Sequence, residues 1–170
     1  MIISNVDEKR VSKLNTYLKS RTPGSGPSLP APSGTDRSIT LHPPDSEVVE
    51  RLLQNLKGEA KKWMDIAIKE IGIPPDHRIA EYAASTDLGP QPTSVPWQSM
   101  FVNWVMETAG YPGTHSGLGR SWLKWGKESE RQIGAIVVFA RPNSPGSVVG
   151  FYVEENKDKD EILVLGWQHL

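Results

Sequence analysis

The chain has 170 residues and a formal net charge of −1, with 37% hydrophobic and 23% charged residues. This composition is typical of a folded globular domain rather than of a disordered chain, and the near-neutral charge gives no support for nucleic acid as a partner. The absence of cysteine excludes disulfides, thiolate metal sites and a cysteine nucleophile.

The N-terminal region differs in character from the rest of the chain. Residues 1–20 place Val11, Leu14 and Leu18 on one side at helical spacing, which predicts a short amphipathic helix. Residues 21–44 are rich in Pro, Gly and Ser, and their few apolar side chains cannot offset the entropy of ordering, so we expect a linker or extended arm. The opening residues contain no apolar stretch of signal-peptide length, and no run of eighteen apolar residues occurs, so we expect neither a signal peptide nor a membrane span.

The main domain, residues 45–170, begins with helical patterns. Apolar residues recur at three- and four-residue steps, and glycines follow at the expected helix ends. Asp76 and Ser116 are expected N-caps of two short helices. The pattern predicts helices from Ser46 to Gly58, over residues 59–71, from Asp76 through Tyr82, over residues 97–109 and from Ser116 to Gly126, with a loop at residues 88–96. In the helix over 97–109, one face is expected to carry Phe101, Trp104, Val105 and Thr108.

The last part of the main domain changes to the pattern of strands. Runs rich in β-branched residues predict strands at residues 135–140, 148–153 and 162–165. Short connections predict an antiparallel meander, and the charged segment 154–161 is expected to form a solvated hairpin turn rather than an interaction patch. Helices followed by a meander predict an α+β fold.

Five sequence blocks follow one another between Trp63 and Gln168, namely WMDIAIKEIGI, RIAEY, PWQSMFVNWVMETAGYPGTHSGLGRSWLKWG, GAIVVFARPNSPGSVVGFYV and VLGWQ. This succession resembles the NlpC-type, papain-like cysteine amidases that cleave peptidoglycan stem peptides. The third block, Pro96 to Gly126, is the most specific, because it resembles the Pro-Trp-Cys opening and the nucleophile helix of that family. The resemblance implies a papain-like fold for the main domain, and residues before Glu59 lie outside it.

The same resemblance places the catalytic positions on residues that cannot perform the chemistry. In such a site a thiolate at a helix start attacks, a strand histidine transfers the proton, and a polar residue orients the histidine. Here Gln98 stands at the position of the cysteine, and Val148, preceded by Ser147, stands at the position of the histidine. Gln168 is the nearest match to the orienting residue. Because loss of such groups costs many orders of magnitude in rate, we predict a pseudo-enzyme.

Other residues near the former cleft are candidates for binding or for a rebuilt catalytic centre. For Ser99 the stronger interpretation is a hydrogen bond at the helix start, for His115 a place in a surface turn, and for His169 an exposed position. The tryptophans are expected mainly to pack, and Trp167 is expected to plug the cleft. The candidate binding residues are Trp97, Gln98, Ser99, His115, Trp122, Trp125 and Trp167. The four histidines lack metal-ligand spacing, so we predict neither a metal nor another cofactor.

We therefore expect a protein that acts by binding a peptidoglycan fragment or a protein partner in an envelope, phage or interbacterial secretion setting. One alternative is an immunity or inhibitor protein against a cell-wall-targeting toxin, and another is a cell-wall hydrolase or secreted effector with a rebuilt active site. Such a protein would be made in a bacterial or phage-infected cytoplasm and act in the periplasm or envelope. The third strand is also expected to offer an open edge to a partner strand.

Overall fold

A computed structural model describes residues 2–3, 51–52, 54–71, 73, 75–92, 95–140, 147–156 and 161–166. The predicted helix in residues 1–20 and the arm at 21–44 lie outside the described residues, apart from Ile2 and Ile3. Residues 167–170, which include Trp167, Gln168 and His169, also lie outside them.

The helices of the main domain are α3 (Ala60–Lys69), α4 (Ile79–Ala84) and α5 (Gln98–Thr108). The short 3₁₀ helix η1 (Pro75–His77) lies between α3 and α4, and a second one, η2 (Gly119–Lys124), lies between α5 and the first strand that follows. Residues 51–52 and 54–55 are also helical. These positions confirm the predicted order of helices. Gly58 and Gly110, two of the predicted helix stops, have φ of +62° and +84°, a conformation in which a side chain would be strained.

The two predicted N-caps were wrong in detail. Asp76 lies inside η1, and Arg78, the residue at the N-cap of α4, makes no side-chain capping bond. The Ser116 hydroxyl oxygen accepts a hydrogen bond from the backbone N–H of Leu118 at 3.2 Å, but Leu118 itself is the N-cap of η2. Ser116 therefore stabilises the turn before η2 without capping it, and Asp76 caps no helix of the described residues.

The strands form a four-stranded sheet in the order β1 (Ile2–Ile3), β2 (Ile136–Ala140), β3 (Ser147–Asn156) and β4 (Glu161–Leu165). Strands β2, β3 and β4 are antiparallel neighbours, which confirms the predicted meander and the α+β class. Strand β1 adds a short parallel pairing, Ile2 with Ile136, at the outer edge of β2.

The charged hairpin is shorter than predicted. Strand β3 continues to Asn156, which is opposite Glu161, and the register shifts by a bulge between Tyr152 and Glu154. The exposed Glu154 carboxylate is 2.8 Å from the Arg51 guanidinium. Acidic residues of the charged segment are compatible with an extended strand here because Glu154 points to solvent.

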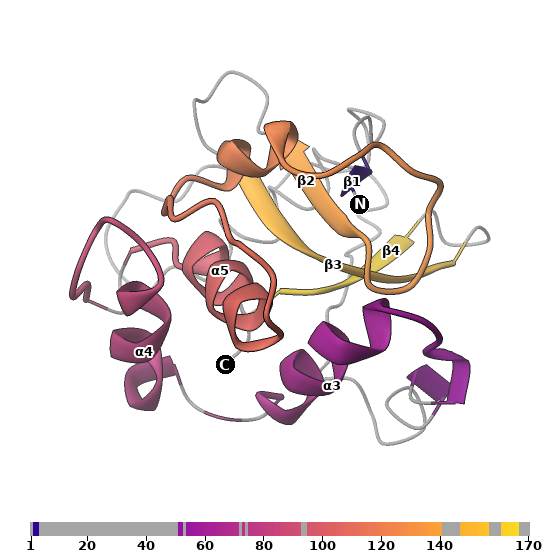
Figure 1. The fold of residues 1–170 in the computed structure, drawn as a ribbon, viewed down its shortest axis with the longest axis horizontal. Coiled ribbons are helices and arrows are strands. Elements are labelled where there is room, and N and C mark those ends of the chain that lie inside the picture. The colour runs from indigo at the N-terminus through magenta and orange to yellow at the C-terminus, as the bar shows by residue number, and fades with distance from the viewer. Residues whose placement is uncertain are drawn as a thin grey trace, which may run out of the picture.

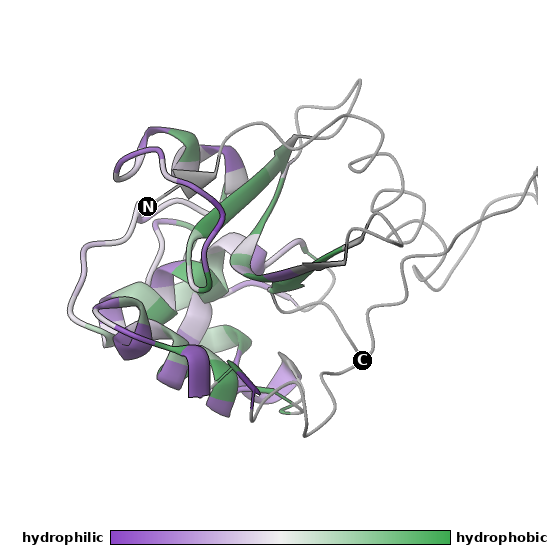
Figure 2. Ribbon diagram, turned by 90° about the vertical axis from the view of Figure 1, so that its right-hand side faces the viewer, coloured by the Kyte–Doolittle hydropathy of each residue, from purple (hydrophilic) through white to green (hydrophobic). Residues whose placement is uncertain are grey.

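The helices cover one face of the sheet, and α5 lies at the centre of this layer (Figure 1). Helix α5 packs on β3 and also contacts α3 and α4. Figure 2 shows apolar residues concentrated on the strands and on the inner sides of the helices. The main core includes Met64, Tyr82, Phe101 and Phe151. The rings of Phe101 and Phe151 meet edge to face, with 6.3 Å between their centroids.

Helix α5 is buried over most of its circumference, well beyond the one face on which apolar residues were predicted. Eight of its eleven residues are buried, whereas Thr108, one of the four residues predicted on that face, is exposed. Neighbours on several sides remove the need for a polar stripe. Within the described part of the chain, no helix combines the length and apolar character that crossing a membrane requires.

A buried ionic cluster, the Glu70 network, joins α3 to α4. The guanidinium of Arg78 donates to both carboxylate oxygens of Glu70, at 2.8 and 3.0 Å, and Tyr82 Oη donates to the same carboxylate at 2.6 Å. Glu81 pairs with Arg78 from the exposed side at 2.7 Å. Burial and the hydrogen bond with Glu70 raise the pKa of Tyr82, and the hydrogen bond with Glu70 also raises the pKa of Arg78.

Candidate functional site

A pocket of about 260 Å³ lies where the start of α5 approaches the start of β3, and we call it the α5–β3 pocket. The sequence resemblance places a cleft at this junction. Four segments meet there: the loop before α5, α5 itself, the residues around the start of η2, and the first residue of β3. The lining residues are Leu88, Gln91, Val95, Pro96, Met100, Gly117, Leu118, Gly119, Arg120 and Ser147.

The pocket has an apolar rim and few polar groups. Leu88 and Leu118, which are 49% and 65% exposed, stand at the rim as two of the exposed large hydrophobic side chains. Arg120 is exposed, and no carboxylate of the described residues lies within ion-pair distance of it. Gln91 donates its side-chain amide to the Leu88 carbonyl at 2.9 Å, which stabilises the loop at the rim. The pocket therefore suits a ligand with an apolar group and a negative charge.

Gly119 sets the close contact between η2 and β3 at one side of the pocket. A Cβ atom at this position would lie 2.8 Å from Ser147 Oγ and 3.0 Å from the Ser147 carbonyl oxygen. Such distances are shorter than normal van der Waals contact, so a side chain would push the two segments apart. The glycine keeps the Ser147 hydroxyl at the pocket wall.

Ser147, rather than Val148, is the β3 residue that reaches this pocket. Alternate residues of a strand face opposite sides of the sheet, and Val149 belongs to the core between the sheet and α5. Val148 packs against the other apolar cluster, with Val137 and Phe139. Val148, the residue that the resemblance aligns with the family's histidine, therefore faces away from α5.

Gln98 is the first residue of α5 and is only 4% exposed. Its side-chain nitrogen Nε2 is buried with no hydrogen-bond partner in the described structure, and Gln98 does not line the α5–β3 pocket. An unpaired buried amide costs roughly 1–3 kcal/mol. A neutral amide thus occupies, inside the core, the position where the resemblance places a nucleophile.

Ser99 holds α5 to the segment that precedes η2. Its hydroxyl donates to the Ser116 carbonyl oxygen at 2.6 Å and accepts from Trp122 Nε1 at 3.0 Å. The predicted partner, a backbone amide at the helix start, was therefore wrong. The prediction that Ser99 has a structural role as a hydrogen-bonding residue at the helix start was right. Neither of the two observed partners is a histidine, so among the described residues Ser99 does not form the Ser–His pair that activates a serine nucleophile.

Asn103 is the centre of a buried polar cluster, the Asn103 network, that sequence reasoning missed. Its side-chain oxygen accepts from the backbone N–H groups of Thr114 and His115 at 2.7 and 2.8 Å, and its amide nitrogen donates to the carbonyls of Ser99 and Ser116 at 2.8 and 3.1 Å. The side chain is completely buried. The sequence did contain one signal of this network, a single amide side chain among apolar residues in the middle of a predicted helix, because a buried polar side chain needs hydrogen-bond partners.

His115 lies in the segment that Asn103 holds, but outside the α5–β3 pocket. It has φ of +54°, and its side chain is 68% exposed with Nδ1 at 3.1 Å from the Glu107 carboxylate. Histidine is one of the non-glycine residues that occur in this conformation in turns. The structure therefore places His115 in a surface turn.

Trp97 and Trp122 lie in the core, with exposed fractions of 5% and 0%. Trp97 stacks on Tyr82 with 6.0 Å between their ring centroids, and the ring centroids of Trp122 and Trp125 are 5.3 Å apart. Trp125 remains half-buried and donates its Nε1 proton to the Pro112 carbonyl at 2.8 Å. Of the candidate tryptophans that the structure describes, Trp125 alone keeps an accessible surface.

Within the described ranges, no three His, Asp or Glu side chains cluster closely enough to hold a metal ion. Comparisons with protein-family models, with curated proteins and with solved structures find no match for this chain. The α5–β3 pocket and the sequence resemblance are therefore the features that bear on its function.

Proposed function

We propose that this chain is a papain-like pseudo-amidase that binds a peptidoglycan stem peptide in the α5–β3 pocket and does not cleave it. The position of the pocket carries the proposal. It lies between the start of α5 and the start of β3, the two elements on which the resemblance places the nucleophile and the base.

The lining of the pocket matches the chemistry of such a ligand. Stem peptides combine small apolar side chains with free carboxylates. Leu88 and Leu118 offer apolar contacts, and the Arg120 guanidinium can bind a carboxylate through two parallel hydrogen bonds. A volume of about 260 Å³ is small beside the ~300–1,000 Å³ of most ligand pockets, so only a short part of the peptide would enter.

The same lining supports binding without hydrolysis. Amide cleavage by covalent catalysis needs a nucleophile and a general base within hydrogen-bond reach of each other. Among the described lining residues Ser147 carries the one hydroxyl, and Arg120 is permanently protonated and cannot accept a proton. Gln98 and Val148, the positions of the ancestral groups, are not in the lining.

The test incubates the purified protein with intact sacculi and with soluble muropeptides, and scores both retention and cleavage. We expect retention without cleavage. The Arg120→Ala variant should bind a muropeptide about tenfold more weakly, because it loses a charge-assisted hydrogen bond, and Leu118→Ala should also weaken binding. The matched controls Leu123→Ala and Lys124→Ala, exposed on η2 but outside the pocket, should bind as the wild type does.

Cleavage of a muropeptide would overturn the proposal that the chain is a pseudo-enzyme, and the nucleophile would then have to be sought elsewhere in the chain. Absence of retention on sacculi together with absence of muropeptide binding would overturn the proposed ligand. Equal losses in Arg120→Ala and Lys124→Ala would mean that binding depends on surface charge alone and would overturn the role of the pocket.

A further inference from the structure

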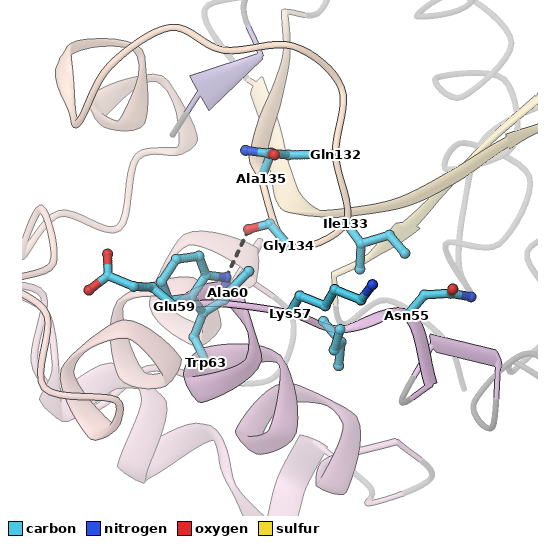
Figure 3. Close-up of a pocket in the computed structure, with 10 residues that line it drawn as sticks. Asn55, Lys57, Glu59, Ala60, Trp63, Gln132, Ile133, Gly134 and Ala135 are labelled. Atoms are coloured by element: carbon cyan, nitrogen blue, oxygen red, sulfur yellow. Dashed lines mark hydrogen bonds between the residues drawn. The ribbon is translucent and has the colours of Figure 1, made fainter.

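A second pocket, of about 400 Å³, lies between the residues that lead into α3 and the residues that lead into β2 (Figure 3). It shares no lining residue with the α5–β3 pocket. Its lining residues are Asn55, Leu56, Lys57, Glu59, Ala60, Trp63, Gln132, Ile133, Gly134 and Ala135. We call it the α3–β2 pocket.

The walls of this pocket are held in place by contacts with the rest of the fold. Trp63 Nε1 donates to the Gly134 carbonyl oxygen at 2.8 Å, and the Trp63 ring meets Tyr111 edge to face at 5.2 Å. The Gly134 N–H donates to the Tyr152 carbonyl at 2.8 Å, which anchors this wall to β3. Both walls are therefore formed before a ligand arrives.

Gly134 is required for this geometry. Its φ is +83°, and a Cβ atom there would lie 2.9 Å from Ala60 Cβ and 3.1 Å from Met64 Cγ. Only a residue without a side chain lets the strand-leading segment approach α3 so closely. The close approach sets the distance between the Trp63 ring and Ile133 on the two sides of the pocket.

The lining combines apolar side chains with one cation that extends across the pocket. Trp63, Ile133 and Leu56 supply apolar surface. Figure 3 shows Lys57 extending across the pocket, whereas the Glu59 carboxylate points outward beyond the Trp63 ring. Neither charged side chain forms an ion pair with a described residue. The Lys57 amine is thus available to a negative charge that enters beside an apolar wall.

We infer that the α3–β2 pocket binds a carboxylate carried on an apolar body, with Lys57 as the ionic contact and Trp63 and Ile133 as the apolar walls. A free acylated amino acid and the C-terminal residue of a peptide share this chemistry. The exposed side-chain amides of Asn55 and Gln132 can add hydrogen bonds to a peptide backbone, which distinguishes the second source from the first.

The test titrates the full ¹⁵N-labelled chain with N-acetyl-leucine, with the uncharged N-acetylleucinamide and with the peptide Ala-Ala-Leu, and follows the Gly134 amide and Trp63 indole signals. We expect saturable shifts with the two carboxylates. Lys57→Gln should weaken the binding of both carboxylates about fivefold. The wild type should bind N-acetylleucinamide about as weakly as the Lys57→Gln variant binds the carboxylates. The matched control Lys69→Gln, which removes an exposed charge from α3 outside the pocket, should change nothing.

Tighter binding of Ala-Ala-Leu than of N-acetyl-leucine would identify a peptide terminus as the source, and the reverse would identify a free acylated amino acid. The inference is overturned if no saturable shift occurs, if acid and amide bind equally, or if Lys57→Gln binds like the wild type. Arg120→Ala should leave these shifts unchanged, because Arg120 lines the other pocket. Carboxylate binding in the α3–β2 pocket and stem-peptide binding in the α5–β3 pocket can therefore be contradicted separately.

Discussion

The Asn103 network and the Glu70 network both bury polar atoms, but the first uses a neutral amide and the second uses opposite charges. Asn103 binds backbone groups of the segment that leads to the α5–β3 pocket. Glu70 binds side chains, and it joins α3 to α4 through Arg78 and Tyr82. One network fixes the shape of a loop, and the other fixes the relative position of two helices.

The difference concerns what each network responds to. A neutral amide that satisfies backbone groups holds its partners at every pH at which the fold persists, and its loss leaves partly buried N–H groups unpaired. An ionic cluster depends on the protonation of its members. We therefore expect the hydrogen bonds of Asn103 to be insensitive to pH and the junction between α3 and α4 to weaken at alkaline pH.

The largest effect is expected for Asn103→Ala. The substitution removes a fully buried amide and leaves the partly buried backbone N–H groups of Thr114 and His115 without their acceptor, so the free energy of unfolding should fall by about 3 kcal/mol. Chemical denaturation measures it. The control Asn55→Ala removes an exposed amide that donates to the Arg51 carbonyl, and it should change stability by less than about 0.5 kcal/mol. Equal effects of the two variants would show that the Asn103 network does not stabilise the fold.

A smaller loss is expected for Glu70→Gln. Arg78 would lose its bidentate carboxylate while its side chain, about three-quarters buried, keeps Glu81 as the remaining anion. The free energy of unfolding should fall by about 2 kcal/mol, less than for a fully buried pair because Glu81 partly compensates. The control Asp65→Asn breaks the exposed pair with Lys61 and should cost less than about 0.5 kcal/mol. A Glu70→Gln protein as stable as the wild type would contradict the role of the ionic cluster.

The smallest effect is a dependence on alkaline pH. The pKa of Tyr82 is raised in the folded state from an ordinary value of 10.0, so above pH 10 the folded state retains a proton that the unfolded state releases. Stability should therefore fall as the pH rises above 10, and Tyr82 should contribute a loss of about 1 kcal/mol by pH 11. Tyr82→Phe should be less stable at pH 7 but should show a flatter decline above pH 10. Parallel curves for the two proteins would refute this origin.

The α+β order of elements could be predicted because helical and strand periodicities are strong local signals. Gly58 and Gly110 marked helix ends, and the β-branched runs located β2 to β4. The burial of α5 on nearly all sides was not predictable, because periodicity reports a contrast between faces and a central helix has little contrast. The length of β3 was missed since charged residues were taken to end a strand.

The sequence indicated the two elements that border the α5–β3 pocket but not the residues that line it. The start of α5 and the start of β3 do meet at a pocket, yet Ser147 lines it while Val148 faces the other side, because a shift of one residue reverses the direction of a strand side chain. Trp97 and Trp122 were candidates for ligand contact, but they pack inside. Ser99 and Asn103 make contacts with partners distant in sequence, which no local pattern reveals.

The pairing of β1 with β2 has a consequence for how the sheet is completed. Ile2 and Ile136 are 134 positions apart, so β1 is synthesised long before its partner strand exists. Closing a loop of this length costs entropy, and a pairing of two residues returns little. The β2–β3 hairpin can form first through short-range contacts. We therefore expect β1 to pair with β2 last, after the chain has left the ribosome. The amide protons of β1 should then exchange with solvent before those of β2 and β3.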